Sequence, residues 1–413
     1  MNVLHINQAD IAGGASIAGY RLHLGLQYKG VNSRLLVGTM TATDANITPI
    51  PSWSWADILL HQATKRLGLN NTNFLSTFTV SNHPFFQEAD ILNFHNLHGY
   101  FNYLALPHLT KNKPAIFTLH DMWSFTGHCT YSYDCNRWIN GCGNCPYPEI
   151  HLAIQRDSTN LEWKLKTWVY KHFNGIVVAP SQWLTKLAQQ SILNCLPIYH
   201  IPYGIDTTAY HPLNPDQCRN ELGIPKDKYV LMFSAANLDD FRKGGDLLLG
   251  ALSNLPESIK NETVLLTVGA IGKNLFKLTE IETLNLGYLT EDRQKAVAYS
   301  AADLFILPSR ADNLPIVLQE SMSCGTPMVA FNIGGVSDLV HSGVTGYLAE
   351  PEQASDMCNG IIRLLEDKQL RKQMEQNCRD LILKEYTLDL QAQRYIELYH
   401  QILHPTNKIK TDI

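Results

Sequence analysis

Several features of membrane-spanning, secreted and nucleic-acid-binding proteins are missing from this 413-residue sequence. It has no run of 18 apolar residues, so no membrane-spanning helix is predicted. The N-terminus reads as a β-strand rather than a signal peptide, so we expect a cytoplasmic protein. The nine cysteines are then not expected to form a disulfide framework. A formal net charge of −5 gives no bulk attraction to nucleic acid.

The fingerprint of dinucleotide-binding enzymes is also absent. Gly13 and Gly14 follow the first predicted strand, but the segment does not read Gly-x-Gly-x-x-Gly. The second predicted strand, 34–37, does not end in the acidic residue that would hold an NAD ribose. A glycine-rich turn that opens a helix could still let the backbone approach an anion. A plain tight turn between strand and helix would give the same pattern, and both interpretations stay open.

The apolar residues that are present follow the pattern of an α/β protein. Hydrophobic residues make up 45% of the chain and charged residues 17%, as in ordinary globular proteins. Short apolar runs alternate with amphipathic stretches of helical length, which predicts parallel sheets covered by helices. The expected strands are 3–6, 34–37, 91–94, 115–119 and 176–179, then 229–233, 264–268, 304–307 and 328–330. We therefore predict two Rossmann-like domains, 1–203 and 204–387, with a last helical stretch, 388–413, packing back on the first.

Charge and histidine are unevenly distributed between the two halves. Residues 1–200 hold 13 Lys and Arg against 10 Asp and Glu, whereas the rest holds 20 against 28. Twelve of the 16 histidines also lie in residues 1–200. The first half is therefore the one expected to face an anionic partner.

Histidines follow two of the predicted strands at the point where each strand ends. His120 comes directly after 115–119, and His95 and His98 follow 91–94. Ligands of open α/β sheets bind at the carboxyl ends of the strands. We therefore predict that His120 donates a hydrogen bond to a substrate or exchanges a proton with it. For His95 and His98, capping of backbone groups at the rim is the favoured interpretation.

Charged residues gather at two strand ends in the second half. Arg242 and Lys243 stand at a strand-to-helix turn, where a cation and helix amides could hold an anion, although a solvated basic turn has the same composition. Asp312 lies just before a helix predicted to begin at Pro315, and Glu320 lies on its second turn. Carboxylates spaced in this way could bind different hydroxyls of one ligand, for instance a sugar and a ribose.

Together these segments resemble the retaining glycosyltransferase family 4, the group 1 glycosyltransferases. Residues 308–327 follow the family pattern of proline-serine, two acids and methionine-x-cysteine-glycine-x-proline, with Asp312 in place of the first glutamate. The family's glycine loop, histidine-aspartate and lysine-glycine are matched in order. Its linker asparagine is replaced by Tyr203, a change expected to affect the hinge rather than the chemistry. The resemblance implies an α/β GT-B fold, with two Rossmann-like domains whose parallel sheets face a central cleft.

The resemblance also implies transfer of a sugar, with retention, from a nucleotide-sugar donor to a saccharide or lipid-linked saccharide acceptor. Glu320 would hold the nucleotide ribose, and Asp312 would touch the hydroxyls of the donor sugar. Lys243 would neutralise the diphosphate, with Arg242 as a second cation. The other implied contacts are His120 near the reacting sugar, the amide of Gly14 beside the diphosphate, the amides of Asn313 and Leu314 near the phosphates, and Gly269 and Tyr288 around the base.

The charge that develops on the leaving diphosphate must be stabilised. Many transferases use a metal ion held by Asp-x-Asp, but this sequence contains no Asp-x-Asp. The task would fall to Lys243, Arg242 and helix N-termini, so we expect no catalytic metal or other cofactor. Two alternatives stay open. A nucleotide-sugar 2-epimerase would convert the donor without an acceptor, and a catalytically silent sugar-nucleotide-binding subunit would not convert it at all.

Four cysteines gather in the loop 123–148, with the spacing C-x5-C-x6-C-x2-C. Such a cluster suits a structural, tetrahedral zinc site. Four reduced thiols in a packed loop and a redox pair are the alternatives. The loop is long and is expected to overhang the site and shape acceptor binding. The candidate zinc ligands are Cys129, Cys135, Cys142 and Cys145.

Two basic stretches, 53–67 and 161–173, carry tryptophans among lysines and arginines. Helices of this kind can lie on anionic membranes, or they can pack on the sheet with their lysines in solvent. With a lipid-linked acceptor, we expect peripheral contact with the inner face of the membrane.

Overall fold

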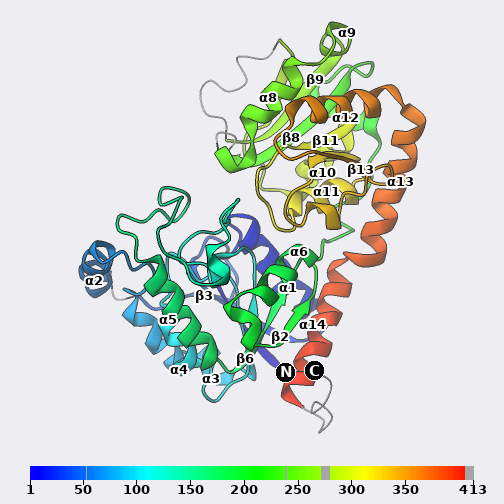
Figure 1. Ribbon diagram of the computed structural model, residues 1–413. Helices are drawn as coiled ribbons and strands as arrows, with labels where there is room; N and C mark the ends of the chain where they lie inside the picture. The colour runs from blue at the N-terminus through cyan, green and yellow to red at the C-terminus, as the bar shows by residue number, and fades with distance from the viewer. Residues whose placement is uncertain (53, 238–239, 271–279, 405–413) are drawn as a thin grey trace. The chain divides into compact units, whose positions relative to one another are not determined.

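The apolar runs of the sequence form two parallel β-sheets, one in each of the two units of the computed structural model (Figure 1). The structure describes residues 1–52, 54–237, 240–270 and 280–404. The first unit comprises Met1–Gly204 with Asp389–Ile413, and the second comprises Ile205–Leu388. These boundaries lie one residue beyond the positions expected from the sequence.

The first unit is built on a seven-stranded sheet in the order β3-β2-β1-β4-β5-β6-β7, and every neighbouring pair is parallel. The strands are β1 (Asn2–Ala9), β2 (Asn32–Thr39), β3 (Ile47–Pro49), β4 (Ile91–Phe94), β5 (Ala115–Thr118), β6 (Gly175–Ala179) and β7 (Ile198–His200). The α-helices are α1 (Gly14–Tyr28), α2 (Ser54–Arg66), α3 (Pro84–Glu88), α4 (Leu106–Leu109), α5 (Thr159–Lys171), α6 (Gln182–Gln190) and α14 (Leu388–Leu403).

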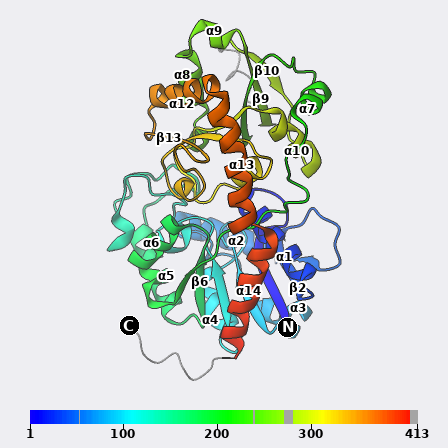
Figure 2. The same ribbon diagram turned by 90° about the vertical axis from the view of Figure 1, so that its right-hand side faces the viewer.

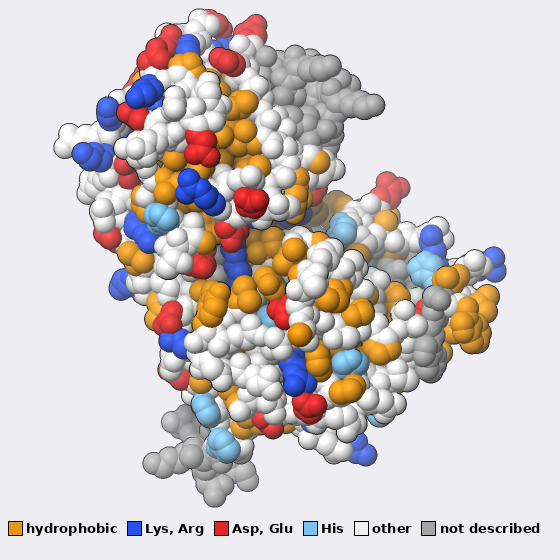
Figure 3. All heavy atoms as spheres, turned by 180° about the vertical axis from the view of Figure 1, so that it is seen from behind, with side chains coloured by type: hydrophobic (Ala, Val, Ile, Leu, Met, Phe, Trp, Pro, Cys, Tyr) orange, Lys and Arg blue, Asp and Glu red, His pale blue; other side chains and the backbone are white. Residues whose placement is uncertain are grey.

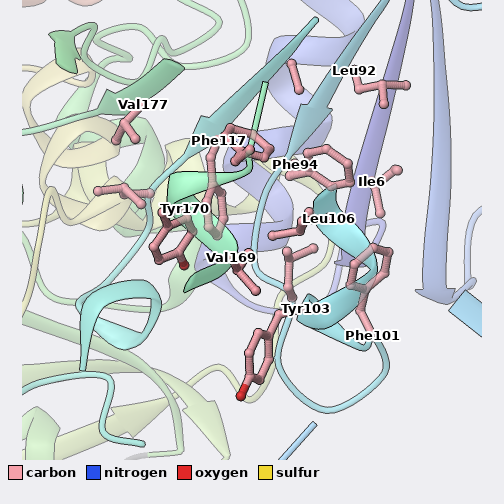
Figure 4. Close-up of a cluster of buried hydrophobic side chains, with 14 of the residues drawn as sticks. Ile6, Leu92, Phe94, Phe101, Tyr103, Leu106, Phe117, Val169, Tyr170 and Val177 are labelled. Atoms are coloured by element: carbon pink, nitrogen blue, oxygen red, sulfur yellow. The ribbon is translucent and has the colours of Figure 1, made fainter. Parts of the chain in front are cut away.

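Alternation along each strand divides this sheet into two buried faces. Ile6, Phe94, Phe117 and Val177 point to one face, where Tyr170 of α5 joins the same hydrophobic cluster (Figure 4). Their sequence neighbours point to the other face. Burial on both sides explains why these strands read as continuous apolar runs rather than as alternating ones.

The second face of the sheet is covered by α1 and by the C-terminal helix α14 (Figure 2). Ile91 and Ile116 of the sheet share a buried cluster with Leu22 of α1 and with Tyr395 and Leu398 of α14. Helix α14 therefore completes the core of the first unit.

The second unit has a six-stranded parallel sheet in the order β10-β9-β8-β11-β12-β13. Its strands are β8 (Tyr229–Asn237), β9 (Thr263–Ala270), β10 (Glu282–Asn285), β11 (Leu304–Leu307), β12 (Met328–Phe331) and β13 (Gly346–Ala349). Its α-helices are α7 (Pro215–Leu222), α8 (Gly245–Ser253), α9 (Glu257–Lys260), α10 (Asp292–Ala301), α11 (Ile316–Ser323), α12 (Ala354–Glu366) and α13 (Lys368–Glu385). One buried cluster joins α8 and α12 to this sheet.

Local signals fix where several helices begin and end. The side chain of Asn214 accepts a hydrogen bond from Gln217 N, Pro215 is the first residue of α7, and Gly223 ends the helix in the left-handed conformation. Ser181 caps α6 in the same way through Leu184 N.

The predicted α/β fold with two Rossmann-like units is confirmed, and each of the nine expected strands is present. Four strands were missed, namely β3, β7, β10 and β13, and all four lie at sheet edges. Edge strands are short and partly exposed, so they lack the buried apolar run by which the others were found. None of the described helices is long and apolar enough to span a membrane.

Candidate functional site

Three charged residues of the predicted donor site meet at the carboxyl edge of the second unit's sheet. Arg242 and Lys243 belong to the 3₁₀ helix η6 (Phe241–Lys243) after β8, and Asp312 lies in the loop after β11. The ammonium of Lys243 lies 2.7 Å from one carboxylate oxygen of Asp312. The guanidinium of Arg242 lies 3.3 Å from the other oxygen. Asp312 therefore holds both predicted phosphate cations.

Burial and the neighbouring charges shift the pKa values of this cluster in opposite directions. Burial is the largest effect on the pKa of Asp312 and raises it, but Lys243 and Arg242 together bring that pKa below its usual value. Burial also lowers the pKa of Lys243, against the opposing effect of Asp312. The carboxylate is therefore ionised at neutral pH and compensates the cations next to it.

Glycines allow two neighbouring loops to approach the loop that carries Asp312. Gly244 has a φ of +68°, and a Cβ there would lie 1.9 Å from the carbonyl oxygen of Pro308. Gly334 has a φ of +51°, and a Cβ there would lie 1.8 Å from the carbonyl oxygen of Asp312. A side chain at either position would push the acidic loop away, which gives the lysine-glycine pair a physical reason.

Arg310 joins two of these loops, and it was not among the residues predicted from the sequence. Its guanidinium pairs with Asp246 at 2.6 Å and with Glu352 at 2.9 Å. It also lies over the ring of Phe241, 3.9 Å from the centroid. These partners are 42 to 69 residues away in the chain, so no local spacing could have identified them.

Glu320 lies on the second turn of α11, as predicted, and is buried. The hydroxyl of Tyr299, on α10, donates to one of its carboxylate oxygens at 3.0 Å. Asn313 and Leu314 are buried directly before this helix. The prediction that Pro315 is the first helical residue was wrong by one position, because its ψ of 117° makes it the N-cap.

The residues expected around the base lie near the end of β9. The amide of Gly269 donates to the carbonyl oxygen of Gly287 at 2.8 Å. Tyr288 follows and is 57% exposed. Its ring is therefore available for stacking.

Gly14 and His120 belong to the first unit. Gly14 begins α1 after Gly13, whose φ is +88°, and no side chain caps this helix. The first amides of α1 are therefore left to solvent or to a ligand.

His120 lies at the carboxyl end of β5 within a chain of buried rings. Its Nε2 atom lies 3.0 Å from Nδ1 of His95, and its Nδ1 atom lies 2.6 Å from the hydroxyl of Tyr203. The rings of His120 and Tyr203 are stacked at 5.5 Å. The chain continues inward, because Nε2 of His95 lies 3.0 Å from Nδ1 of His5. Both ring nitrogens of His120 are thus used inside the first unit.

Burial keeps these imidazoles neutral at physiological pH. It lowers the pKa of His120 to about 4, with a smaller opposing effect from Asp121. Burial also lowers the pKa of His95 and of His5 well below the usual histidine value. The sequence could have indicated that the rings of His95 and His120 are aligned. Side chains alternate between the two faces of the sheet along β4 and β5, so residues two positions apart point to the same face.

The predicted zinc ligands are free, half-buried thiols. Gly127 N donates to Sγ of Cys142, and Nε2 of His128 lies 3.2 Å from Sγ of Cys145. Burial raises the pKa of Cys129 to about 12 and that of Cys142 to about 11. Within the described part of the chain, no group of three or more His, Cys, Asp or Glu side chains is arranged to hold a metal ion. The zinc site, including Cys135, therefore stays a prediction.

Comparison with known proteins identifies related sequences and folds. Residues 215–381 match the family model described as glycosyl transferases group 1. The D-inositol 3-phosphate glycosyltransferase 1 of Catenulispora acidiphila is 31% identical over 185 residues, which are 41% of this chain and 44% of that protein. The putative colanic acid biosynthesis glycosyl transferase WcaC of Escherichia coli is 26% identical over 354 residues, which are 80% of this chain and 83% of that protein.

Among solved structures, HepE of Anabaena in complex with UDP and glucose has a TM-score of 0.70 at 18% sequence identity. The match covers 97% of this chain and 100% of that one. At this identity the likeness shows a common fold. The match to the Catenulispora acidiphila protein spans less than half of that protein's length.

Proposed function

Because residues 215–381 form a group 1 glycosyl transferase domain, we propose that the protein transfers a sugar from a nucleotide-sugar donor to a saccharide or lipid-linked saccharide acceptor. We further propose that transfer retains the anomeric configuration and serves polysaccharide or glycoconjugate biosynthesis. The match to a polysaccharide-biosynthesis protein over 80% of the chain supports this pathway class. The UDP and glucose bound by the structural neighbour support a nucleotide-sugar donor.

The observation that carries the proposal is the cluster of Lys243, Arg242 and Asp312. Departure of the diphosphate leaves additional negative charge, and preformed cations stabilise it as it develops. The ammonium of Lys243 has three N–H donors, and one contact to Asp312 leaves two for phosphate oxygens. The N-terminus of α8, which begins at Gly245, adds backbone amides directly beside these cations.

The proposed division of labour places Asp312 at the hydroxyls of the transferring sugar. It places Glu320, held by Tyr299, at the ribose of the nucleotide. Asn313 and Leu314 would present backbone amides to the phosphates. His120 stays a candidate beside the reacting sugar, and Gly14 one beside the diphosphate.

Transfer is expected to continue in the presence of EDTA, because protein cations rather than a metal ion on Asp-x-Asp would balance the diphosphate. The measurement is release of nucleoside diphosphate from a panel of nucleotide sugars, with and without saccharide acceptors. Activity lost in EDTA and restored only by Mg²⁺ or Mn²⁺ would contradict the proposed mechanism. Acceptor-independent conversion of the donor would favour the 2-epimerase, and binding without turnover would favour the silent subunit.

Elemental analysis of the same preparation, purified without chelator, would test the structural zinc site.

A membrane surface is the partner that we propose for helix α2. Trp55, Ile58 and Leu59 are 73%, 60% and 64% exposed and share one side of the helix. The last turn adds exposed Lys65 and Arg66. Figure 3 shows hydrophobic and basic side chains gathered at the edge of the first unit where α2 lies. Trp53, part of the same predicted stretch, lies outside the described residues.

The positive charge on the exposed side of α2 favours an anionic lipid bilayer as its binding partner. The one acidic residue of α2, Asp57, is buried and accepts hydrogen bonds from Leu75 N and the hydroxyl of Ser76. The exposed side of the helix therefore combines apolar side chains with positive charge alone. This combination binds the interface of anionic lipid membranes.

Replacing Trp55 and Ile58 together by serine is expected to lower binding to phosphatidylglycerol-containing vesicles several-fold in a sedimentation assay. Leu383→Ser is the matched control, because Leu383 is an exposed leucine of the second unit, on α13. Equal binding of wild-type protein to pure phosphatidylcholine vesicles would contradict the charge argument. An unchanged affinity in the double variant would rule out α2 as the docking face.

A further inference from the structure

The first turn of α8 carries an acidic side chain at the place where the proposed function needs a phosphate. Asp246 is the second residue of this helix, which begins at Gly245, two residues after Lys243. Hydrogen bonds from Arg310, and further ones from the backbone amides of Asp246 and Leu247, lower the pKa of the Asp246 carboxyl. The ionised carboxylate therefore lies at the helix N-terminus that would attract the diphosphate, and two anions at one helix end repel each other.

Arg310 holds this carboxylate with both arms of its guanidinium. Its Nη1 and Nη2 atoms lie 2.9 and 2.6 Å from the two carboxylate oxygens of Asp246. A lysine could not reproduce this bidentate geometry. Nη1 also donates to the carbonyl oxygen of Phe241 at 2.7 Å, and the side chain of Arg310 is only 6% exposed. The guanidinium is therefore fixed by the fold itself on the carboxylate of Asp246.

A second carboxylate, that of Glu352, binds the same guanidinium. It accepts a hydrogen bond from Nε of Arg310 at 2.9 Å. The side chains of Asp246 and Glu352 are equally exposed, at 57%. They differ in position, because Glu352 follows β13 and lies outside the helices. Glu352 therefore offers a comparison in which the charge and the partner are the same but the helix N-terminus is absent.

We propose that Arg310 is a positioning residue of the donor site, which acts on the diphosphate by cancelling the charge of Asp246 at the start of α8. The pair of Arg310 with Asp246 carries no net charge, so it does not oppose the attraction of the phosphates by Lys243 and by the helix N-terminus. Arg310 does not need to touch the ligand for this effect. The inference rests on the proposed function for the identity of the ligand, whereas the charge effect can be measured with any diphosphate.

The test is titration calorimetry of the full chain with inorganic pyrophosphate, which has the charged groups of a diphosphate and needs neither base nor sugar. Arg310→Met is expected to weaken pyrophosphate binding about tenfold, because it leaves the charge of Asp246 uncompensated. Asp246→Asn, at an exposed position, is expected to tighten binding several-fold. The double variant should return to within about threefold of the wild type, since both charges are then gone.

A purely structural role of Arg310 predicts different results. The double variant would then bind pyrophosphate as weakly as Arg310→Met does, and this outcome would overturn the proposal. Asp246→Asn provides a test that does not depend on the folding of Arg310→Met. If it binds pyrophosphate no more tightly than the wild type, the proposal is equally wrong.

Glu352→Gln is the matched control, because it removes the other carboxylate that Arg310 holds. Combined with Arg310→Met, it should restore less affinity than Asp246→Asn does. Equal restoration by both would assign the effect to overall charge rather than to α8 and would overturn the proposal. Lys243→Met should weaken pyrophosphate binding at least as much as Arg310→Met. A smaller effect would place the ion at another site, with the same consequence.

The wild-type protein separates this proposal from the proposed function. Absence of pyrophosphate binding at millimolar concentration would overturn the role of Arg310, because there would be no diphosphate site for it to serve. Binding of pyrophosphate, with the expected effects of the variants but without binding of any nucleoside diphosphate or sugar nucleotide, would instead reject the proposed function and leave the charge effect standing.

Discussion

Replacing Lys243 by methionine is expected to lower kcat for sugar transfer by about 10²–10³-fold, the usual effect of removing one preorganised group that stabilises developing charge. Methionine keeps an unbranched apolar side chain in place of the lysine stem but removes the ammonium that lies 2.7 Å from Asp312. Steady-state kinetics with saturating acceptor would measure the loss. Binding of the intact sugar nucleotide should change less, because the extra charge of the diphosphate appears only as the sugar leaves.

Two controls separate this catalytic effect from a loss of folding. Lys260→Met removes a lysine of the same unit whose contacts are with Glu257 and Glu280, and it should leave kcat unchanged. Acid unfolding reports the pairing of Lys243 with Asp312. The pKa of Asp312 is lowered in the fold, so the pair stabilises the protein above the unfolded carboxyl pKa and loses this effect as the pH falls. Lys243→Met should therefore unfold at a higher pH than the wild type. A kcat within threefold of the wild type would exclude Lys243 from the reaction.

Replacing Glu320 by glutamine is expected to weaken the binding of free nucleoside diphosphate by about 1.5–3 kcal/mol, which is roughly 10- to 150-fold in Kd. A hydrogen bond from a ribose hydroxyl to a buried carboxylate is charge-assisted, and glutamine keeps the shape without the charge. Titration calorimetry with the diphosphate would measure the change. Tyr299 can still donate to the glutamine oxygen, so the fold of α11 should be preserved.

Asp312→Asn provides the contrast to Glu320→Gln. Asp312 lies against the cations rather than beside Tyr299. Its replacement by asparagine removes a negative charge that competes with phosphate for Lys243, so it should not weaken diphosphate binding. Its kcat should fall because the sugar contact is lost. Glu366→Gln, at an exposed position on α12, is the control for a neutralised glutamate. If Asp312→Asn weakens diphosphate binding as much as Glu320→Gln does, the proposed division between sugar and ribose contacts is wrong.

The sequence by itself determined the fold class and the positions of the central strands along the chain, because strands buried on both faces must be continuous apolar runs. It also located the residues of the proposed donor site in the second unit. Lys243, Asp312 and Glu320 were found from their places after strands and before helices, and these places follow from local turn and helix chemistry. The resemblance to group 1 glycosyl transferases, carried by the same residues, is confirmed for 215–381.

Only the tertiary structure decided which of these groups pair with each other. Arg310 joins Asp246 and Glu352, and Asp312 holds Lys243 and Arg242. Such contacts depend on which loops the parallel strands bring to the same edge of the sheet. The spacing of residues in the sequence does not encode the distance between those loops. The tertiary structure also decided the partner of Tyr203, whose place in the linker motif predicted an effect on the hinge. Its hydroxyl meets His120, 83 residues earlier, because the strand ends of the first sheet align three imidazoles that are far apart in the chain.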